Sequence, residues 1–169
     1  MHNIIILGGN SFLGKRLIAD LSNLKINVVA TTRSCISNIN NDSDYIDWKT
    51  CDPVNKYQLA SLVNNGDVVI NLIYAGIPED DLAIIRNIID VSKKVQLKKF
   101  IHISTACLGE IQDTTIINEQ SIYRPHSVYE NKKMLLEKVL TPSHLSSKLI
   151  IIRPTVIFGP GGRLSLIHI

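Results

Sequence analysis

The feature that most constrains this chain is a repeated alternation between short runs of β-branched residues and longer stretches with helical spacing. Nearly continuous Val/Ile runs are typical of strands covered by helices on both faces, and their alternation with helices indicates parallel β-α-β units. The pattern predicts strands at residues 3–7, 27–31, 44–46, 67–73, 99–104 and 148–153. It predicts helices at residues 12–23, 55–64, 79–96 and 127–140. We therefore expect an α/β fold: a doubly wound parallel sheet of Rossmann type.

Composition narrows the classes of protein to consider. A length of 169 residues corresponds to about one domain, which can bury a core without disulfides or a structural metal. The three cysteines form no C-x-x-C pair, so we expect neither a disulfide framework nor a metal site. A net charge of +3 is too small to indicate a nucleic-acid partner. No apolar run is long enough for a membrane span, and the first residues do not resemble a secretion signal, so we expect a cytoplasmic protein.

A glycine-rich turn follows the first predicted strand and leads directly into a helix. It consists of residues 8–14, and its candidate binding residues are Gly8, Ser11, Phe12, Leu13 and Gly14. Such a turn brings backbone N–H groups and a helix N-terminus close to a pyrophosphate, so the motif predicts a dinucleotide site. The alternative is a glycine turn that only lets strand and helix pack.

The end of the second predicted strand bears on the choice of cofactor. A carboxylate there would bind the ribose 2′-hydroxyl of NAD, whereas a basic residue accepts the 2′-phosphate of NADP. Here the acidic residue is missing and Arg33 follows the strand. We therefore expect NADP in preference to NAD. Alternatively, Arg33 is an ordinary solvated side chain lying over the adenine.

A second motif places a phenol and an ammonium one helical turn apart. Tyr129 and Lys133 form Y-x-x-x-K, so both side chains lie on one face of the predicted helix. A nearby ammonium favours the phenolate and would make tyrosine useful as an acid or base. Ser104 lies at the end of the fifth predicted strand, where ligands bind in such sheets, and we expect it to bind a substrate oxygen.

Taken together, these motifs resemble the extended short-chain dehydrogenases/reductases of the NAD-dependent epimerase/dehydratase family. The similarity covers residues 3–163, and the spacing from Ser104 to Tyr129 also fits. The matching pieces are residues 8–14, Asp52, residues 104–109, residues 125–133 and residues 153–161. The resemblance implies an NAD(P)-binding Rossmann domain over residues 1–163 and a longer parent protein that carries most of the substrate domain. Residues 164–169 match a translated sequencing-library adapter, so we expect them to be a non-native tail.

The resemblance also implies roles for individual residues. Tyr129 would be the general acid/base, Ser104 would orient the substrate, and Lys133 would bind the nicotinamide ribose and lower the pKa of Tyr129. Asp52 would contact the adenine, or would only form a turn before Pro53. The remaining cofactor-binding residues would be Leu72, Ile73 and Pro154, although Ala75 and Gly76 could align in place of the first two.

Departures from the family pattern narrow the chemistry. In 4,6-dehydratases of this family an Asp-Glu pair follows the active-site hydroxyl, whereas Thr105-Ala106 follows Ser104 here, which argues against dehydration. Epimerases acting at two carbons carry a cysteine two residues beyond the serine. Ala106 holds that position, and Cys107, one residue later, is expected to face the opposite side and to be structural. Val156 replaces an asparagine that often holds a nucleotide-sugar diphosphate.

The sequence therefore predicts an NAD(P)-dependent epimerase or oxidoreductase acting on a nucleotide sugar, by Tyr-Lys-Ser chemistry and hydride transfer with nicotinamide. One alternative is an NADPH-dependent ketone reductase acting on a different metabolite. Another is a non-catalytic NAD(P)-binding sensor. The resemblance also makes a homodimer possible, while neither a nucleic acid nor a membrane is expected as a partner.

Overall fold

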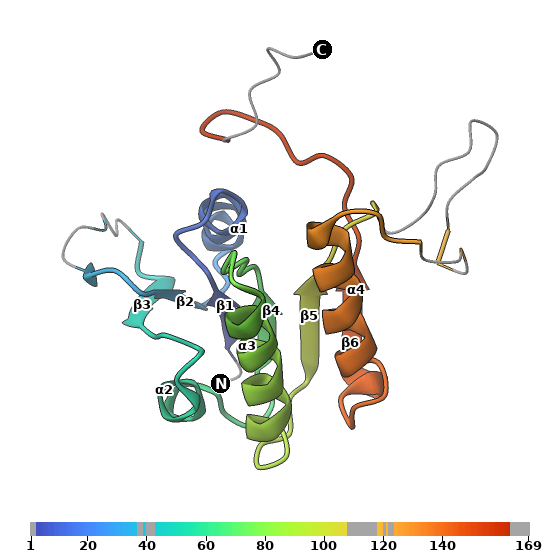
Figure 1. Cartoon of the computed structure of the whole chain (residues 1–169). Coiled ribbons are helices and arrows are strands. Elements are labelled where there is room, and N and C mark those ends of the chain that lie inside the picture. Colours follow the sequence, from blue (N-terminus) through green and yellow to red (C-terminus); the bar gives the residue numbers. More distant parts are fainter. Residues whose placement is uncertain are drawn as a thin grey trace.

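The computed structural model describes residues 3–36, 39, 43–107, 118–119, 121 and 124–162. Within them, six parallel strands form one sheet in the order β3-β2-β1-β4-β5-β6 (Figure 1). The strands are β1 (Ile4–Leu7), β2 (Val28–Thr32), β3 (Ile46–Thr50), β4 (Val68–Asn71), β5 (Lys99–Ile103) and β6 (Leu149–Ile152). This is the Rossmann order, and the expected fold class is confirmed. The strand order reverses between β1 and β4, and open α/β sheets bind ligands outside the carboxyl ends of the strands at such a point.

Five of the predicted strands agree with the structure to within two residues at each end, but the third is displaced. The prediction is residues 44–46, whereas β3 spans Ile46–Thr50. The strand lies at the edge of the sheet and pairs only with β2. An edge strand does not need a continuous apolar run, and Asp47 and Lys49 are exposed. Because these polar residues interrupt the apolar pattern, the sequence did not predict the strand at residues 46–50.

Four α-helices connect the strands. They are α1 (Phe12–Asn23), α2 (Lys56–Leu62), α3 (Pro78–Val91) and α4 (Val128–Leu140), and a short 3-10 helix spans Ser146–Lys148. Helix α3 ends five residues before the predicted end at residue 96, where the backbone changes to turn bonds from the Lys93 N–H to the Asp90 carbonyl and from the Lys94 N–H to the Val91 carbonyl. None of these helices is long and apolar enough to cross a membrane, as far as the described residues go.

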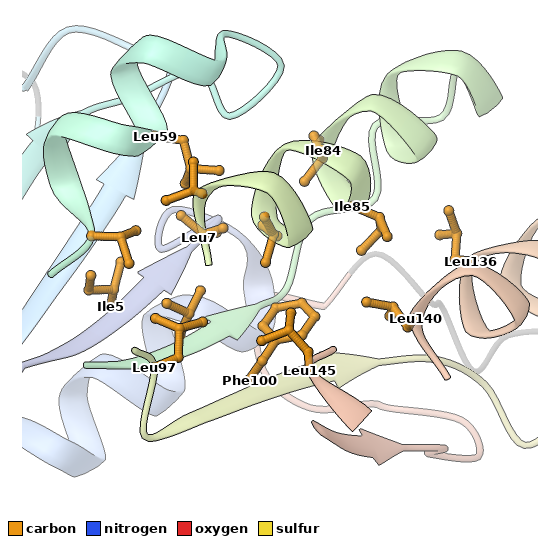
Figure 2. Close-up of a cluster of buried hydrophobic side chains, with 14 residues drawn as sticks. Ile5, Leu7, Leu59, Ile84, Ile85, Leu97, Phe100, Leu136, Leu140 and Leu145 are labelled. Atoms are coloured by element: carbon orange, nitrogen blue, oxygen red, sulfur yellow. The ribbon is translucent and has the colours of Figure 1, made fainter. Parts of the chain in front are cut away.

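The core lies on both faces of the sheet because successive strand residues point to opposite sides. Ile5 and Leu7 face the side covered by α2, α3 and α4, where they join a buried cluster that includes Phe100 (Figure 2). Ile6 faces the other side, where Ile18 of α1 packs in a smaller cluster. The fold thus fixes α1 on one face and α4 on the other.

Two sets of side-chain hydrogen bonds hold helix α4, one at its start and one near its end. A capping box closes its N-terminus, where the Ser127 hydroxyl accepts from the Glu130 N–H and the Glu130 carboxylate accepts from the Ser127 N–H. Near the other end, Arg153 donates from Nε and Nη2 to the two oxygens of Glu137, over 3.0 and 2.6 Å. A bidentate pair of this kind holds both partners in one orientation. The capping box therefore fixes where α4 begins, and Arg153 ties its second half to the end of β6.

Candidate active site

The glycine turn after β1 brings α1 against the strand. Gly8 has φ +86°, a left-handed conformation that favours glycine. A Cβ added to Gly14 would lie 2.5 Å from the Gly8 oxygen and 2.6 Å from the Gly9 oxygen, so only glycine lets α1 begin this close to the turn. Ser11 is the N-cap of α1, and its hydroxyl accepts from the Gly14 N–H at 3.0 Å.

A cavity of about 240 Å³ opens beside this turn. Of the predicted cofactor residues, it is lined by Gly8, Ser11, Arg33, Leu72 and Ile73. Its other lining residues, which sequence reasoning missed, are Asn10, Thr31, Thr32, Ser34, Cys51 and Tyr74. Most lie at the carboxyl ends of β1, β2 and β4, which is where open α/β sheets bind ligands.

Asp52 is not among the residues that line this cavity. Its carboxylate Oδ1 accepts from the Val54 N–H at 3.2 Å, which is the turn alternative, and its neighbour Cys51 faces the cavity instead. Burial and the Asp52 charge raise the pKa of Cys51 to about 11, so this thiol stays protonated at neutral pH. The adenine contact of Asp52 stays a prediction.

A larger cavity of about 1040 Å³ joins the glycine turn to helix α4. Ser11 and Phe12 line it from one side, Tyr129 from another, and Ile157 and Gly161 from the segment after β6. Leu13 is not among the lining residues of either cavity. The space beside the predicted pyrophosphate turn therefore continues to the predicted acid/base.

Tyr129 and Lys133 lie together on α4, as their spacing predicts. The Lys133 Nζ is 5.9 Å from the centroid of the Tyr129 ring, and it donates to the Ile103 carbonyl at 2.8 Å. Lys133 is buried, with 5 % of its surface exposed, whereas Tyr129 is 39 % exposed at the cavity. The lysine thus ties the first half of α4 to the end of β5.

The chain after β5 continues as an extended segment. The Ser104 N–H donates to the Ile152 carbonyl at 2.8 Å, and the Ala106 N–H donates to the Pro154 carbonyl at 2.9 Å. Such alternation continues the parallel pairing with β6, so successive side chains of residues 104–106 point to opposite sides. Pro154, a predicted cofactor residue, thus lies beside this segment, because its carbonyl accepts the hydrogen bond from the Ala106 N–H.

Because of this alternation, Thr105 rather than Ser104 reaches Tyr129. Hydrogen bonding with the Thr105 side chain lowers the pKa of Tyr129. The Ser104 hydroxyl instead lies beside Glu137, whose pKa it lowers, and its Oγ is buried without a hydrogen bond of good geometry. In this structure Thr105 is thus nearer to the phenol than Ser104 is, and the catalytic role of Ser104 stays a prediction.

Cys107 lies where the extended segment ends in a turn. Its N–H donates to the Thr105 Oγ1 at 3.2 Å, and its side chain is exposed. Its charge when ionised would raise the pKa of Tyr129. The expectation that Cys107 is structural stays a prediction.

The electrostatics of Tyr129 also differ from the expectation. Burial raises its pKa above the ordinary value and outweighs the lowering by Thr105 and Lys132. Burial lowers the pKa of Lys133. Tyr129 is therefore protonated at neutral pH. The predicted action of Lys133 on the pKa of Tyr129 stays a prediction.

Three further residues beside Tyr129 escaped the sequence reasoning. Tyr74 packs its ring against that of Tyr129, and Lys132 lies over the Tyr74 ring and pairs with Asp81. Acids in the first turn of a helix, as Glu79, Asp80 and Asp81 are in α3, ordinarily complement the helix dipole. However, Asp81 belongs to the buried stripe of α3 with Ile84, and a charge in a buried stripe signals a buried partner.

A buried histidine lies beneath this group. His102 is 1 % exposed, and its Nδ1 lies 3.4 Å from the Asn71 Nδ2. Burial, reinforced by the Lys133 charge, lowers the pKa of His102 to about 3, so its ring is neutral at physiological pH. In the part of the chain that is described, no group of three or more His, Cys, Asp or Glu residues could hold a metal ion.

The arrangement fits a dinucleotide. Because Gly14 has no Cβ, the N-terminus of α1 can lie directly against the glycine turn, where its N–H groups can bind a phosphate. The adjoining cavity is lined by a cationic side chain, Arg33, at the end of β2. Beyond the turn, the second cavity presents a protonated phenol and, near it, a hydroxyl and two ammonium groups. Such a set can bind a phosphate-containing ligand and exchange one proton with an oxygen of a second ligand.

Comparison with known proteins identifies the family. The family model described as NAD dependent epimerase/dehydratase matches residues 4–167. No curated protein matches the chain.

Several solved structures share the fold. A dTDP-glucose 4,6-dehydratase from Bacillus anthracis, in complex with NAD, superposes with a TM-score of 0.78 at 19 % identity over 95 % of this chain and 56 % of that chain. A glucuronic acid dehydrogenase from Chromohalobacter salexigens gives 0.74 at 18 % identity, covering 90 % of this chain and 60 % of the other. A UDP-N-acetylglucosamine 4-epimerase from Bacillus cereus gives 0.70 at 20 % identity, covering 89 % and 56 %. The chain thus spans little more than half the length of these proteins.

Proposed function

We infer the function from one premise: the chain belongs to the NAD dependent epimerase/dehydratase family. On that premise we propose that it is the nucleotide-binding part of an NAD(P)-dependent oxidoreductase or epimerase that acts on a nucleotide-activated sugar. Tyr129 would exchange the proton of a sugar hydroxyl or ketone oxygen. The observation that carries this proposal is the shared cavity, which the glycine turn lines at Ser11 and Phe12 and helix α4 lines at Tyr129.

Each residue of the site has a role in this proposal. A bound nicotinamide cofactor would supply the hydride chemistry. Tyr129 is protonated at neutral pH because burial raises its pKa, so it is ready to donate a proton to a ketone oxygen during reduction. Thr105 would orient that oxygen in place of the predicted Ser104. Lys133 would bind the ribose of the cofactor.

We propose NADP as the preferred cofactor. Arg33 and Ser34 line the nucleotide cavity where β2 ends, and Arg33 is exposed there without a carboxylate in the position that would favour NAD. A guanidinium can bind a 2′-phosphate through two hydrogen bonds, whereas the 2′-hydroxyl of NAD offers it no charge.

A second candidate function follows from the position of Cys107. If Thr105 is the active-site hydroxyl, then the cysteine two residues beyond it is Cys107, which is the position that two-carbon epimerases of this family use. The thiol is exposed, and its charge when ionised would act on the pKa of Tyr129. The reaction would then include proton removal from a carbon beside the ketone. Ala106 and Cys107 supply no Asp-Glu pair, so dehydration stays disfavoured.

The two candidates differ in a measurable product. With NADPH and nucleotide 4-ketosugars, a reductase consumes one equivalent of cofactor per turnover. A two-carbon epimerase instead incorporates solvent deuterium beside the ketone, which proton NMR detects, and Cys107→Ala would abolish that exchange. If neither reaction occurs and Tyr129→Phe changes no activity, the non-catalytic sensor is supported. The homodimer suggested by the family resemblance stays a prediction.

A further inference from the structure

A buried ion pair connects helices α3 and α4 beside the active site. The Lys132 ammonium pairs with the Asp81 carboxylate, and the two side chains are only 5 % and 4 % exposed. The second oxygen of Asp81 accepts from the Ala75 N–H at 2.9 Å. Asp81 therefore holds both the lysine of α4 and the backbone that follows β4.

The same lysine lies on the ring of Tyr74. The Lys132 Nζ is 4.0 Å from the centroid of that ring, which is within the range of a cation–π contact. Tyr74 in turn packs edge-on against Tyr129, with ring centroids 5.4 Å apart. Tyr74 lines both the nucleotide cavity and the larger cavity.

We propose that Lys132 is a positioning residue of the active site: held by Asp81, it fixes the ring of Tyr74 on which Tyr129 packs and keeps a positive charge beside this pair of rings. This inference rests on the proposed function, in which Tyr129 exchanges a proton. The two adjacent lysines then have different roles: Lys132 positions the tyrosine rings, and Lys133 is available to bind the cofactor ribose.

Stability alone does not account for a charged pair at this place. Two buried apolar side chains of similar size are often as stabilising as a buried ion pair, because charged groups must lose their hydration. What an apolar pair would lack is a positive charge beside the phenol. The Lys132 charge lowers the pKa of Tyr129 and acts against the burial that raises it.

Other groups face the phenol from the elements packed around it. Tyr74 and Cys107 raise the pKa of Tyr129, and Thr105 lowers it by hydrogen bonding. Lys133 lies on the same helix, with its Nζ bonded to the Ile103 carbonyl. Lys132→Met removes the charge and also releases the Tyr74 ring, so its effect on the pKa of Tyr129 reports both parts of the role proposed for Lys132.

The test is a titration of Tyr129 in this chain. Difluorotyrosine, whose phenol is more acidic than that of tyrosine, is placed at position 129 alone, and its ionisation is followed by fluorine NMR. The other four of the five tyrosines then stay silent. We expect Lys132→Met to raise the pKa at position 129 by roughly half a unit or more. Lys132→Arg, which keeps the charge and the cation–π contact, should restore it.

A matched control and a second variant make the result decisive. Lys138 is exposed on the same helix, so Lys138→Met should leave the titration unchanged. Since Lys132→Met leaves Asp81 buried without its partner, the double variant Asp81→Asn/Lys132→Met removes both charges and should show the same upward shift. A folded double variant with an unchanged pKa would overturn the proposal. Loss of folding in both variants would assign the pair a structural role and overturn it too.

The experiments distinguish failure of the proposed function from failure of the proposal for Lys132. A chain that binds neither NADPH nor NADH would contradict the enzymatic assignment, yet the titration at position 129 would still measure the effect of Lys132. Conversely, cofactor binding with no shift in the Lys132 variants would leave the proposed function standing and remove this inference.

Discussion

The ring of Tyr74 lies edge-to-face against the ring of Tyr129, with centroids 5.4 Å apart and ring planes inclined by 70°. Tyr74 follows β4 and Tyr129 belongs to the first turn of α4, so the contact joins the two sides of the crevice above the sheet. A change at the nucleotide cavity is therefore expected to reach the phenol.

Two neighbouring hydroxyl residues should behave differently when they are removed. Thr105→Val deletes the hydrogen bond that lowers the pKa of Tyr129, so that pKa should rise by about one unit. Ser104→Ala, the matched control, should leave it unchanged because Ser104 lies beside Glu137. Fluorine NMR of difluorotyrosine at position 129 measures both. A shift in the Ser104 variant alone would reinstate Ser104 as the partner of the phenol.

Arg33→Ala should change the choice of cofactor. Losing the guanidinium at the nucleotide cavity should weaken NADPH binding roughly tenfold and leave NADH binding nearly unaltered. Fluorescence titration with each cofactor gives both dissociation constants. Arg86, exposed on α3, provides the control Arg86→Ala, for which neither constant should change. Equal losses for the two cofactors would contradict a 2′-phosphate contact.

Gly14→Ala should damage both folding and binding. Its methyl group would press on the backbone oxygens of Gly8 and Gly9, which cannot rotate away. We expect a loss of roughly 1–3 kcal/mol in the free energy of unfolding, together with loss of cofactor binding. The comparison is Gly9→Ala, whose methyl would meet the side chains of Ile18 and Trp48 instead. Urea unfolding should show the larger loss for Gly14→Ala, and the reverse order would contradict the close approach.

His102 should make the chain sensitive to acid. Its pKa is about 3 in the folded chain, against an ordinary value of 6.5 for an exposed ring, so between these pH values the unfolded chain binds one more proton. The contribution is therefore present above pH 6.5 and declines as the pH falls towards 3, by about 1.4 kcal/mol per unit. His102→Gln should flatten this part of the urea-derived stability profile. The exposed His126→Gln should not, and equal slopes in both variants would refute the assignment.

The sequence could predict most of the sheet because its strands are nearly continuous apolar runs. It could not predict β3 equally well, since Asp47 and Lys49 interrupt the run on an edge strand. The glycine turn was predictable for a similar reason. The conformation of Gly8 and the close backbone contact at Gly14 favour glycine, so the turn can be recognised from its glycines in the sequence.

The candidate site was predictable only in part. Tyr129 and Lys133 share a helix, so their spacing alone places them together. The hydroxyl partner depends on which side of an extended segment faces α4, and a shift of one residue exchanges Ser104 for Thr105. Tyr74, in the segment after β4, and Asp81, on α3, reach Tyr129 and Lys132 through tertiary packing against α4, which no local sequence pattern indicates.

The most direct test of the central claim is NADPH titration of the chain with difluorotyrosine at position 129. The claim is that one site joins the glycine turn to the phenol. It predicts that the fluorine resonance shifts and saturates together with the nicotinamide fluorescence, and that Gly14→Ala removes both responses. Saturable NADPH binding with an unmoved resonance at position 129 would contradict the claim.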